Sequence, residues 1–220
     1  KGKKIDCLAT CPISKEAINK AGFKYSGHTE YFIKKTKVRH VVMMLLNKNL
    51  KFSLITRHLP IKDVPGALNI DKILDATRIT YLSLKNIFKI PYPRIALCGL
   101  NPHASDNGLI GDEEENIIRP AVERLKKTFK RINGPIPSDI AIYRALRGGY
   151  DAVMAMYHDQ ALIPLKITGK DSGVNISLGL PFIRTSPLHG TAFDIAGKHK
   201  FANPDSLISA IKLALKCVLG

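Results

Sequence analysis

The chain has 220 residues, 45% of them hydrophobic and 24% charged, a composition that fits a folded globular protein and excludes disordered and fibrous classes. Its 34 basic and 18 acidic residues give a formal net charge of +16, which permits binding to nucleic acid or to anionic substrates. The lysines are scattered, aromatic residues make up only 7% and tryptophan is absent, so a solvated basic surface is favoured over a nucleic-acid partner. No apolar run approaches the roughly 20 residues that span a bilayer, so no membrane partner is expected.

Apolar runs alternate along the chain with segments of helical spacing. Strands are predicted at residues 5–10, 41–46, 52–56, 94–99, 152–156, 162–167 and 174–178. Helices are predicted at residues 14–21, 70–88, 112–129, 139–147 and 205–219. Ser14 is expected to cap the first helix, and three glutamates in the first turn of the third suit the positive end of a helix dipole. Strands that alternate with helices predict an α/β architecture.

The cysteines and the first residues of the chain indicate the cellular compartment of the protein. Cys7 and Cys11 are close in sequence, but no second close pair completes a zinc-finger pattern. Four cysteines in a chain of this length are not disulfide-dense, so we expect reduced thiols and a cytoplasmic protein. The chain opens at Lys1 without a methionine and without a secretory signal, so its true start is expected to lie upstream.

Three histidines occupy equivalent places. His58, His103 and His158 each follow a predicted strand, and the carboxyl ends of strands form the ligand crevice in open α/β sheets. Three imidazoles that converge there could hold a divalent metal with positions left open for substrate. The alternative, which stays open at this point, is that each histidine is an ordinary polar residue at a strand end.

Several strings occur in the order in which they occur in one family and together cover nearly the whole chain. They are Pro12-Ile13-Ser14-Lys15, Gly27-His28-Thr29-Glu30, His58-Leu59-Pro60, Asn101-Pro102-His103-Ala104, Tyr157-His158-Asp159-Gln160 and Leu180-Pro181-Phe182-Ile183-Arg184-Thr185. In these strings the chain resembles the PdxA family of pyridoxal phosphate biosynthesis, the 4-hydroxythreonine-4-phosphate dehydrogenases.

The resemblance implies a fold like that of the isocitrate and isopropylmalate dehydrogenases, with two α/β/α lobes and a cleft between them. Residues 1–22 and 161–220 would form the first, cofactor-side lobe, and residues 23–160 the second lobe, which carries the metal site and the dimer contact. A homodimer with the site at the subunit interface is implied. The first third of the family's usual chain is absent, so the first lobe is expected to be incomplete.

The resemblance also assigns site residues. His58, His103 and His158 would bind one divalent metal, which would be zinc, magnesium or cobalt. The phosphorylated substrate would contact His28, Thr29, Lys166, Asn175 and Arg184, where lysine and arginine are cations suited to phosphate. The segment 189–204 is similar to the dinucleotide-binding loop of the wider dehydrogenase group, so NAD or NADP would contact Gly190, Thr191, Asp194 and Asn203. The alternatives are surface charge for the two cations and a plain turn for the loop.

The implied reaction is NAD-dependent oxidation of 4-phosphooxy-L-threonine to a β-keto acid. That acid would lose carbon dioxide to give 3-amino-2-oxopropyl phosphate, a step in pyridoxal 5'-phosphate (vitamin B6) biosynthesis. Lys166 and Asp139 are the candidate catalytic residues for proton handling. Asp139 has an alternative interpretation as an ordinary helix N-cap.

The sequence departs from the family pattern at a few places. Cys11 replaces a glycine, Ser105-Asp106-Asn107 replaces Gly-Glu-Gly, and Ile140 replaces a threonine. Two other functions therefore stay open: a related 4-phospho-threonate or 4-phospho-erythronate dehydrogenase, and a truncated, non-catalytic metal-binding homologue. Because an incomplete lobe would not hold both walls of the cleft in register, we expect the chain alone to show little or no dehydrogenase activity.

Overall fold

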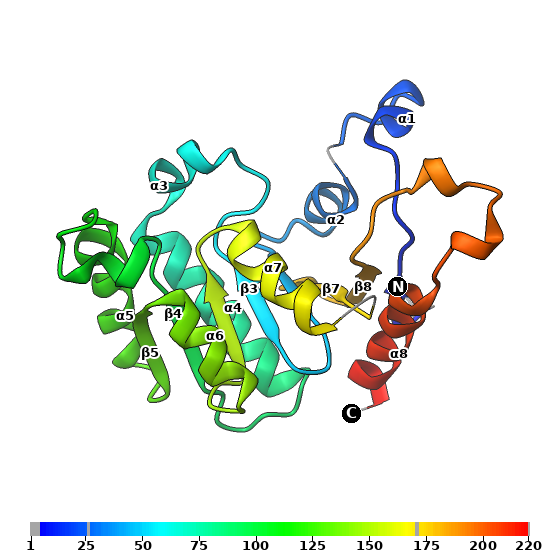
Figure 1. Cartoon of the computed structure of the whole chain (residues 1–220). Helices are drawn as coiled ribbons and strands as arrows, with labels where there is room; N and C mark the ends of the chain where they lie inside the picture. Colours follow the sequence, from blue (N-terminus) through cyan, green and yellow to red (C-terminus); the bar gives the residue numbers. More distant parts are fainter. Residues whose placement is uncertain (1–4, 26, 170–171, 220) are drawn as a thin grey trace.

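An eight-stranded mixed sheet runs through the molecule (Figure 1). The computed structural model describes residues 5–25, 27–169 and 172–219. The strands are β1 (Cys7–Ala9), β2 (Val42–Leu46), β3 (Lys51–Leu54), β4 (Ile95–Cys98), β5 (Ile132–Ile136), β6 (Ala152–Ala155), β7 (Val174–Leu178) and β8 (Ile183–Pro187), in the order β1-β8-β7-β2-β3-β6-β4-β5. Because β3, β6, β4 and β5 are mutually parallel, their carboxyl ends share one edge of the sheet.

Helices cover both faces of the sheet. They are α1 (Lys15–Lys20), α2 (His28–Thr36), α3 (Val64–Ala67), α4 (Ile70–Asn86), α5 (Arg119–Lys126), α6 (Ser138–Leu146), α7 (His158–Gly169) and α8 (Asp205–Leu219). Shorter turns are η1 (Ile61–Asp63), η2 (Pro102–Asp106), η3 (Glu114–Ile118), η4 (Phe193–Ile195) and η5 (His199–Phe201). None of the helices in the described part of the chain is both long and apolar enough to cross a membrane.

Alternate side chains of each central strand enter two different cores. Met154 of β6 belongs to the core on the face that α4, α5 and α8 cover, whereas Val153 belongs to the core under α6 and α7. The same alternation holds in β4, where Leu97 faces the first core and Ala96 the second. This three-layer arrangement confirms the predicted α/β class.

One part of the second face has no helix over it. On β7 and β8, Val174, Ile176 and Thr185 face the α8 side, and Thr185 Oγ1 donates to the carbonyl of Ala210 in α8 at 2.9 Å. The side chains that alternate with these three along β7 and β8 therefore project to the opposite face of the sheet. Figure 1 shows α2, rather than α6 or α7, on that side of β7 and β8. This uncovered stretch of sheet becomes the floor of the cleft described below.

The structure corrects several of the predicted elements. Residues 162–167 are not a strand but the middle of α7, whose Ala161 and Leu165 are buried while Ile163 and Ile167 are exposed. The predicted helix at 112–129 is split into a π-helical turn, η3, and α5. Among the described helices and strands, four were not predicted: α2, α3, β5 and β8. The predicted cap is confirmed, because Ser14 Oγ accepts a hydrogen bond from the Ala17 amide at 3.2 Å.

The two expected lobes draw on different stretches of one continuous sheet. β1, β7 and β8 come from the residues assigned to the first lobe, and the other strands come from residues 23–160. The antiparallel pairing of β2 with β7 joins the two groups. The division into lobes and the incompleteness of the first remain predictions, and residues 1–4, 170–171 and 220 of the first lobe lie outside the described residues.

Candidate active site

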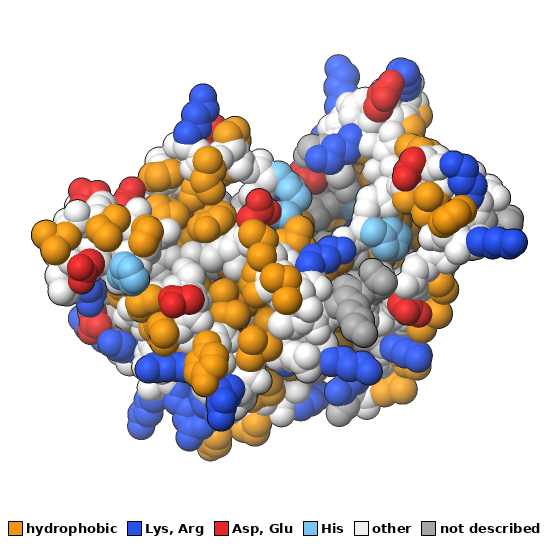
Figure 2. All heavy atoms as spheres, in the orientation of Figure 1, with side chains coloured by type: hydrophobic (Ala, Val, Ile, Leu, Met, Phe, Trp, Pro, Cys, Tyr) orange, Lys and Arg blue, Asp and Glu red, His pale blue; other side chains and the backbone are white. Residues whose placement is uncertain are grey.

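A cleft of 760 Å³ opens over the uncovered part of the sheet. It is lined by five of the residues expected to bind substrate or metal: His28, Thr29, His58, Asn175 and Arg184. Figure 2 shows the surface hollowed here, between the protruding α1 segment and the rest of the molecule, with histidine side chains in the hollow. The fold thus brings together residues that lie up to about 150 positions apart in the sequence.

Arg184 is a buried cation with no carboxylate of the described residues at ion-pair distance. Its side chain, on β8, is only 4% exposed. Two of its nitrogens donate to Thr10 Oγ1, Nε at 3.1 Å and Nη2 at 2.6 Å, and Nη1 donates to Ser177 Oγ at 3.3 Å. Burial lowers the pKa of Arg184 to about 10, and the nearby charge of Glu30 opposes that shift. The two hydroxyls that bind this desolvated guanidinium are neutral, so its positive charge favours binding of an anion in the cleft.

Asn175 supplies a buried acceptor atom that has no hydrogen-bond partner among the described residues. It lies on β7, and its Oδ1 atom is buried and accepts no hydrogen bond within the described part of the chain. Buried polar atoms in native proteins nearly always have a partner, so an orphan that lines a cleft indicates a ligand donor such as a hydroxyl or ammonium group.

His28 and Thr29 form the first turn of α2. The N-cap of this helix is Gly27, which offers no side-chain hydrogen bond, so among the described residues no side chain caps the first amides of α2. Burial, followed by the charge of Arg184, lowers the pKa of His28, and its ring stacks on Phe32 with centroids 6.2 Å apart. Both effects favour the neutral form of the His28 imidazole.

Two of the three predicted metal ligands lie together. The rings of His58, which follows β3, and His158, at the start of α7, have centroids 5.2 Å apart. His158 Nδ1 donates to Asp159 Oδ1 at 2.7 Å, which leaves Nε2 free to act as a ligand. Burial, then the charges of His158, Lys15 and Arg57, lower the pKa of His58, while Glu30 opposes them. The lowered pKa of His58 favours the neutral form that a divalent metal requires, and His158 presents its Nε2 atom.

His103 does not join them within this chain. It is exposed, in η2 after β4, and β6 separates β4 from β3 in the sheet. In the described residues no group of three histidine, cysteine, aspartate or glutamate side chains is arranged to hold a metal. Within the described residues of one chain, His58 and His158 lie together and His103 lies apart. The assignment of all three histidines to one metal remains a prediction.

The turn that carries His103 is left-handed. Residues 103–107 all have positive φ, between 45° and 68°, although none is a glycine. Ser105 and Asn107, which the resemblance set against two glycines, adopt a conformation that only glycine takes without steric cost. Asparagine tolerates it better than most residues do.

We predict that Asn107→Ala lowers the free energy of unfolding by roughly 1 kcal/mol relative to Asn107→Gly, because the alanine Cβ is strained at a φ of 58°. Urea denaturation of the two variants measures the difference. At Glu123, an exposed position inside α5, the order should be reversed, with glycine the less stable variant. Equal stability of the two Asn107 variants would contradict the left-handed turn.

A buried glutamate that the sequence did not single out holds this turn in place. Glu114 is fully buried in η3, and its Oε1 accepts hydrogen bonds from the amides of Leu100 and Asn101 at 2.7 and 2.8 Å. Its Oε2 accepts from Asn101 Nδ2 at 2.9 Å. The carboxylate thereby fixes the backbone two residues before His103.

The residues expected to bind the cofactor line a second cavity, of 840 Å³, that adjoins the cleft. It includes Gly190, Thr191 and Asn203, together with Lys166 of α7. Cys11, Gly190 and three other residues line both cavities. Asp194, in η4, does not line it, and Asn203 Oδ1 accepts from the amide of Asp205 at the start of α8.

Asp139 is placed away from both cavities. It lies exposed in the first turn of α6, beside η2, and the N-cap position belongs to Pro137. The interpretation of Asp139 as an N-cap is therefore wrong. Asp139 and His103 instead share the far end of the sheet edge, near β4.

Comparison with known proteins identifies the family. The family model described as pyridoxal phosphate biosynthetic protein PdxA matches residues 1–214. The 4-hydroxythreonine-4-phosphate dehydrogenase of Sulfurihydrogenibium sp. is 50% identical over 213 residues, which are 97% of this chain and 65% of that protein. That of Ruegeria sp. is 49% identical over 212 residues, covering 96% of this chain and 65% of the relative.

Solved structures give the same picture. A 4-hydroxythreonine-4-phosphate dehydrogenase from Klebsiella pneumoniae superimposes with a TM-score of 0.89 at 42% identity, covering 97% of this chain and 65% of that one. A terephthalate 1,2-cis-dihydrodiol dehydrogenase from Burkholderia xenovorans does so with a TM-score of 0.75 at 29% identity, covering 97% and 67%. The chain spans 60% to 65% of the length of the first three curated relatives. Because the family model matches nearly the whole chain and the relatives share about half of its residues, the chain belongs to the PdxA family.

Proposed function

We propose that the cleft oxidises 4-phosphooxy-L-threonine with NAD or NADP, giving a β-keto acid that loses carbon dioxide to yield 3-amino-2-oxopropyl phosphate. The observation that carries this proposal is the buried, carboxylate-free guanidinium of Arg184, in a cleft that also holds the orphan acceptor of Asn175. A phosphorylated substrate with a hydroxyl or ammonium group satisfies both. The relatives named as dehydrogenases of this substrate support it.

The residues of the cleft have separate roles in this proposal. Arg184 and the uncapped first turn of α2, at His28 and Thr29, bind the phosphate, since a guanidinium and helix amides both favour anions. Asn175 accepts a hydrogen bond from the substrate and orients it. Neutral His28 can donate to a phosphate oxygen without repelling Arg184.

His58 and His158 would hold one divalent cation, which we propose is zinc, magnesium or cobalt. That ion would stabilise negative charge on the substrate oxygen as the hydroxyl becomes a ketone. The neutral His58 and the Asp159-oriented His158 support the assignment.

The second cavity would place the nicotinamide cofactor beside the substrate, against Gly190, Thr191 and Asn203, with Asp194 nearby in the same loop. Lys166 lines this cavity and is the proposed proton-handling group there. Hydride would pass from the substrate carbon to the nicotinamide, and the hydroxyl proton would leave to a basic group of the protein.

His103 and Asp139 would serve the site of a second copy of the chain in a homodimer. Both lie at the far end of the sheet edge, away from the Arg184 cleft, yet His103 carries a ligand-type side chain on an exposed, rigidly held turn. A site built from two subunits accounts for a metal pair that lacks its third ligand. The four cysteines are all free thiols, which supports a location in the reducing cytoplasm.

The function is tested by following NADH absorbance with a divalent metal and a panel of substrates, using both the chain and a protein of its relatives' full length. The proposal predicts turnover of 4-phosphooxy-L-threonine and none of unphosphorylated threonine. Turnover only of 4-phospho-threonate or 4-phospho-erythronate would reassign the substrate. Metal binding without any turnover in the longer protein would instead indicate a non-catalytic homologue.

A further inference from the structure

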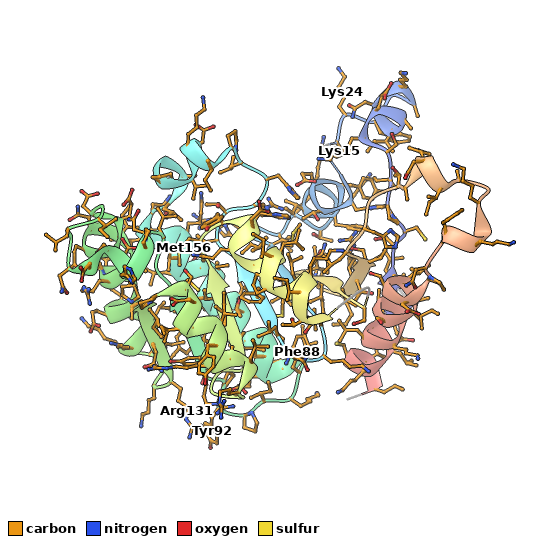
Figure 3. The ribbon with its side chains drawn as sticks, in the orientation of Figure 1. Lys15, Lys24, Phe88, Tyr92, Arg131 and Met156 are labelled. Atoms are coloured by element: carbon orange, nitrogen blue, oxygen red, sulfur yellow. The ribbon has the colours of Figure 1, made fainter. Side chains whose placement is uncertain are left out.

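A separate cavity of 620 Å³ lies at the opposite end of the sheet from the cleft. It is formed by the β2–β3 turn, the end of α4, the start of β7 and the last turns of α8. Figure 3 shows Phe88, which lines this cavity, at the lower end of the sheet, far from Lys15, which lines the cleft. Its volume lies within the range of small-molecule sites.

The floor of the cavity is apolar. Phe88, Ile90, Leu213 and Cys217 are half-buried and pack against the main core while they also line the cavity. Their outer surfaces are therefore available to an apolar group without any rearrangement of the core.

The rim of the cavity is cationic. Lys48, Lys51, Lys89 and Lys216 line it, and no aspartate or glutamate does so in the described part of the chain. None of these lysines forms an ion pair or donates a hydrogen bond to another described residue. Figure 2 shows further lysine and arginine side chains along this lower edge of the molecule.

Lys51 is the most constrained of the four. Its Nζ lies 5.8 Å from the centroid of the Phe88 ring, over the apolar floor. Burial lowers the pKa of Lys51, the charge of Lys216 lowers it further, and Asp151 opposes both. Asp151 already binds Arg94 through both of its oxygens, at 3.1 and 2.9 Å, so it does not neutralise Lys51.

We propose that this cavity binds a phosphomonoester with an aromatic or aliphatic body, at a site distinct from the Arg184 cleft. The apolar part would lie on Phe88 and Leu213, and the phosphate would bridge Lys51 and Lys216. A phosphate suits the rim better than a carboxylate does, because its charge of nearly −2 compensates two neighbouring cations at once. The inference does not depend on the proposed dehydrogenase function.

The test is lysine acetylation, quantified residue by residue by mass spectrometry, with phenyl phosphate as the probe. At about ten times its dissociation constant, phenyl phosphate should slow acetylation of Lys51 and Lys216 about tenfold. Lys85 and Lys212, exposed residues on α4 and α8 outside the cavity, should react unchanged. Any protection of Lys15 and Lys166 reports on the two active-site cavities separately.

Two comparisons decide the result. Phenol and inorganic phosphate at the same concentration should give little protection, because each supplies only half of the recognised chemistry. The double variant Lys51→Gln/Lys216→Gln should lose the protection of Lys89, whereas Lys85→Gln/Lys212→Gln, with the same change in net charge, should retain it. Equal protection by inorganic phosphate, or no difference between Lys51 and Lys85, would overturn the proposal.

Discussion

Replacement of Arg184 by alanine is expected to weaken binding of a phosphorylated substrate roughly ten- to a hundredfold. Arg184 is a buried cation of the cleft, and its two hydroxyl partners are neutral, so an anionic ligand would compensate its charge directly. A charge-assisted, forked contact of this kind contributes about 1.5–3 kcal/mol. Calorimetric titration with 4-phosphooxy-L-threonine measures the loss.

The matched variant is Arg184→Lys, which retains the charge but loses the planar guanidinium. Its affinity for the phosphorylated substrate should lie between those of the wild type and of Arg184→Ala. Binding of unphosphorylated threonine should not depend on residue 184. Since the side chain also bonds Thr10 and Ser177, thermal unfolding of each variant must show that the fold is kept. Unchanged affinity for the phosphorylated ligand in a folded Arg184→Ala protein would remove Arg184 from the site.

Loss of the Glu114 carboxylate is expected to have the largest effect on stability. Glu114→Ala leaves the amides of Leu100 and Asn101 buried without an acceptor, at a cost of about 1–3 kcal/mol each. The free energy of unfolding should therefore fall by roughly 2–5 kcal/mol in urea denaturation. Glu114→Gln keeps one acceptor oxygen, so its free energy of unfolding should fall by less than that of Glu114→Ala.

The neighbouring Glu115 is the control, because it is one residue away but exposed and paired with Arg119 at 2.7 Å. Glu115→Gln should leave the unfolding midpoint nearly unchanged. Hydrogen exchange of the amides of residues 100–107 should accelerate in Glu114→Gln and not in Glu115→Gln. If Glu114→Ala unfolds at the wild-type midpoint, the carboxylate does not hold the turn.

The strands and helices were predictable wherever the spacing of apolar residues was unambiguous, as in α4 and β6. Prediction from apolar spacing failed where a short apolar run fits either a strand or a helix. Residues 162–167 contain Pro164, which disfavours a helix interior. The buried pair Ala161 and Leu165 nevertheless has helical spacing. β5 was missed because Asn133-Gly134-Pro135 has the composition of a turn. As an edge strand, β5 tolerates a proline.

The candidate site was predictable in part, through the family strings and the strand-end rule. Asn175, Arg184 and His58 lie together because neighbouring strands carry them to one region. Thr10 and Ser177 were missed, since nothing local marks a hydroxyl that will meet an arginine from another strand. Glu114 was missed because three successive glutamates look like a solvated first turn, and only the π-helical turn shows which of them points inward.

If one active site combines the Arg184 cleft of one chain with His103 of another, as proposed above, mixing two impaired variants reveals it directly. Arg184→Ala and His103→Ala are made in whichever form shows turnover, then unfolded together and refolded. Random pairing makes half of the dimers mixed, and each mixed dimer has one intact site, so about a quarter of the wild-type activity should return. Each variant refolded alone, assayed at a substrate concentration well below its dissociation constant, should show about a tenth of the wild-type activity or less. No recovery in the mixture, with mixed dimers verified by mass spectrometry, would contradict the two-chain site.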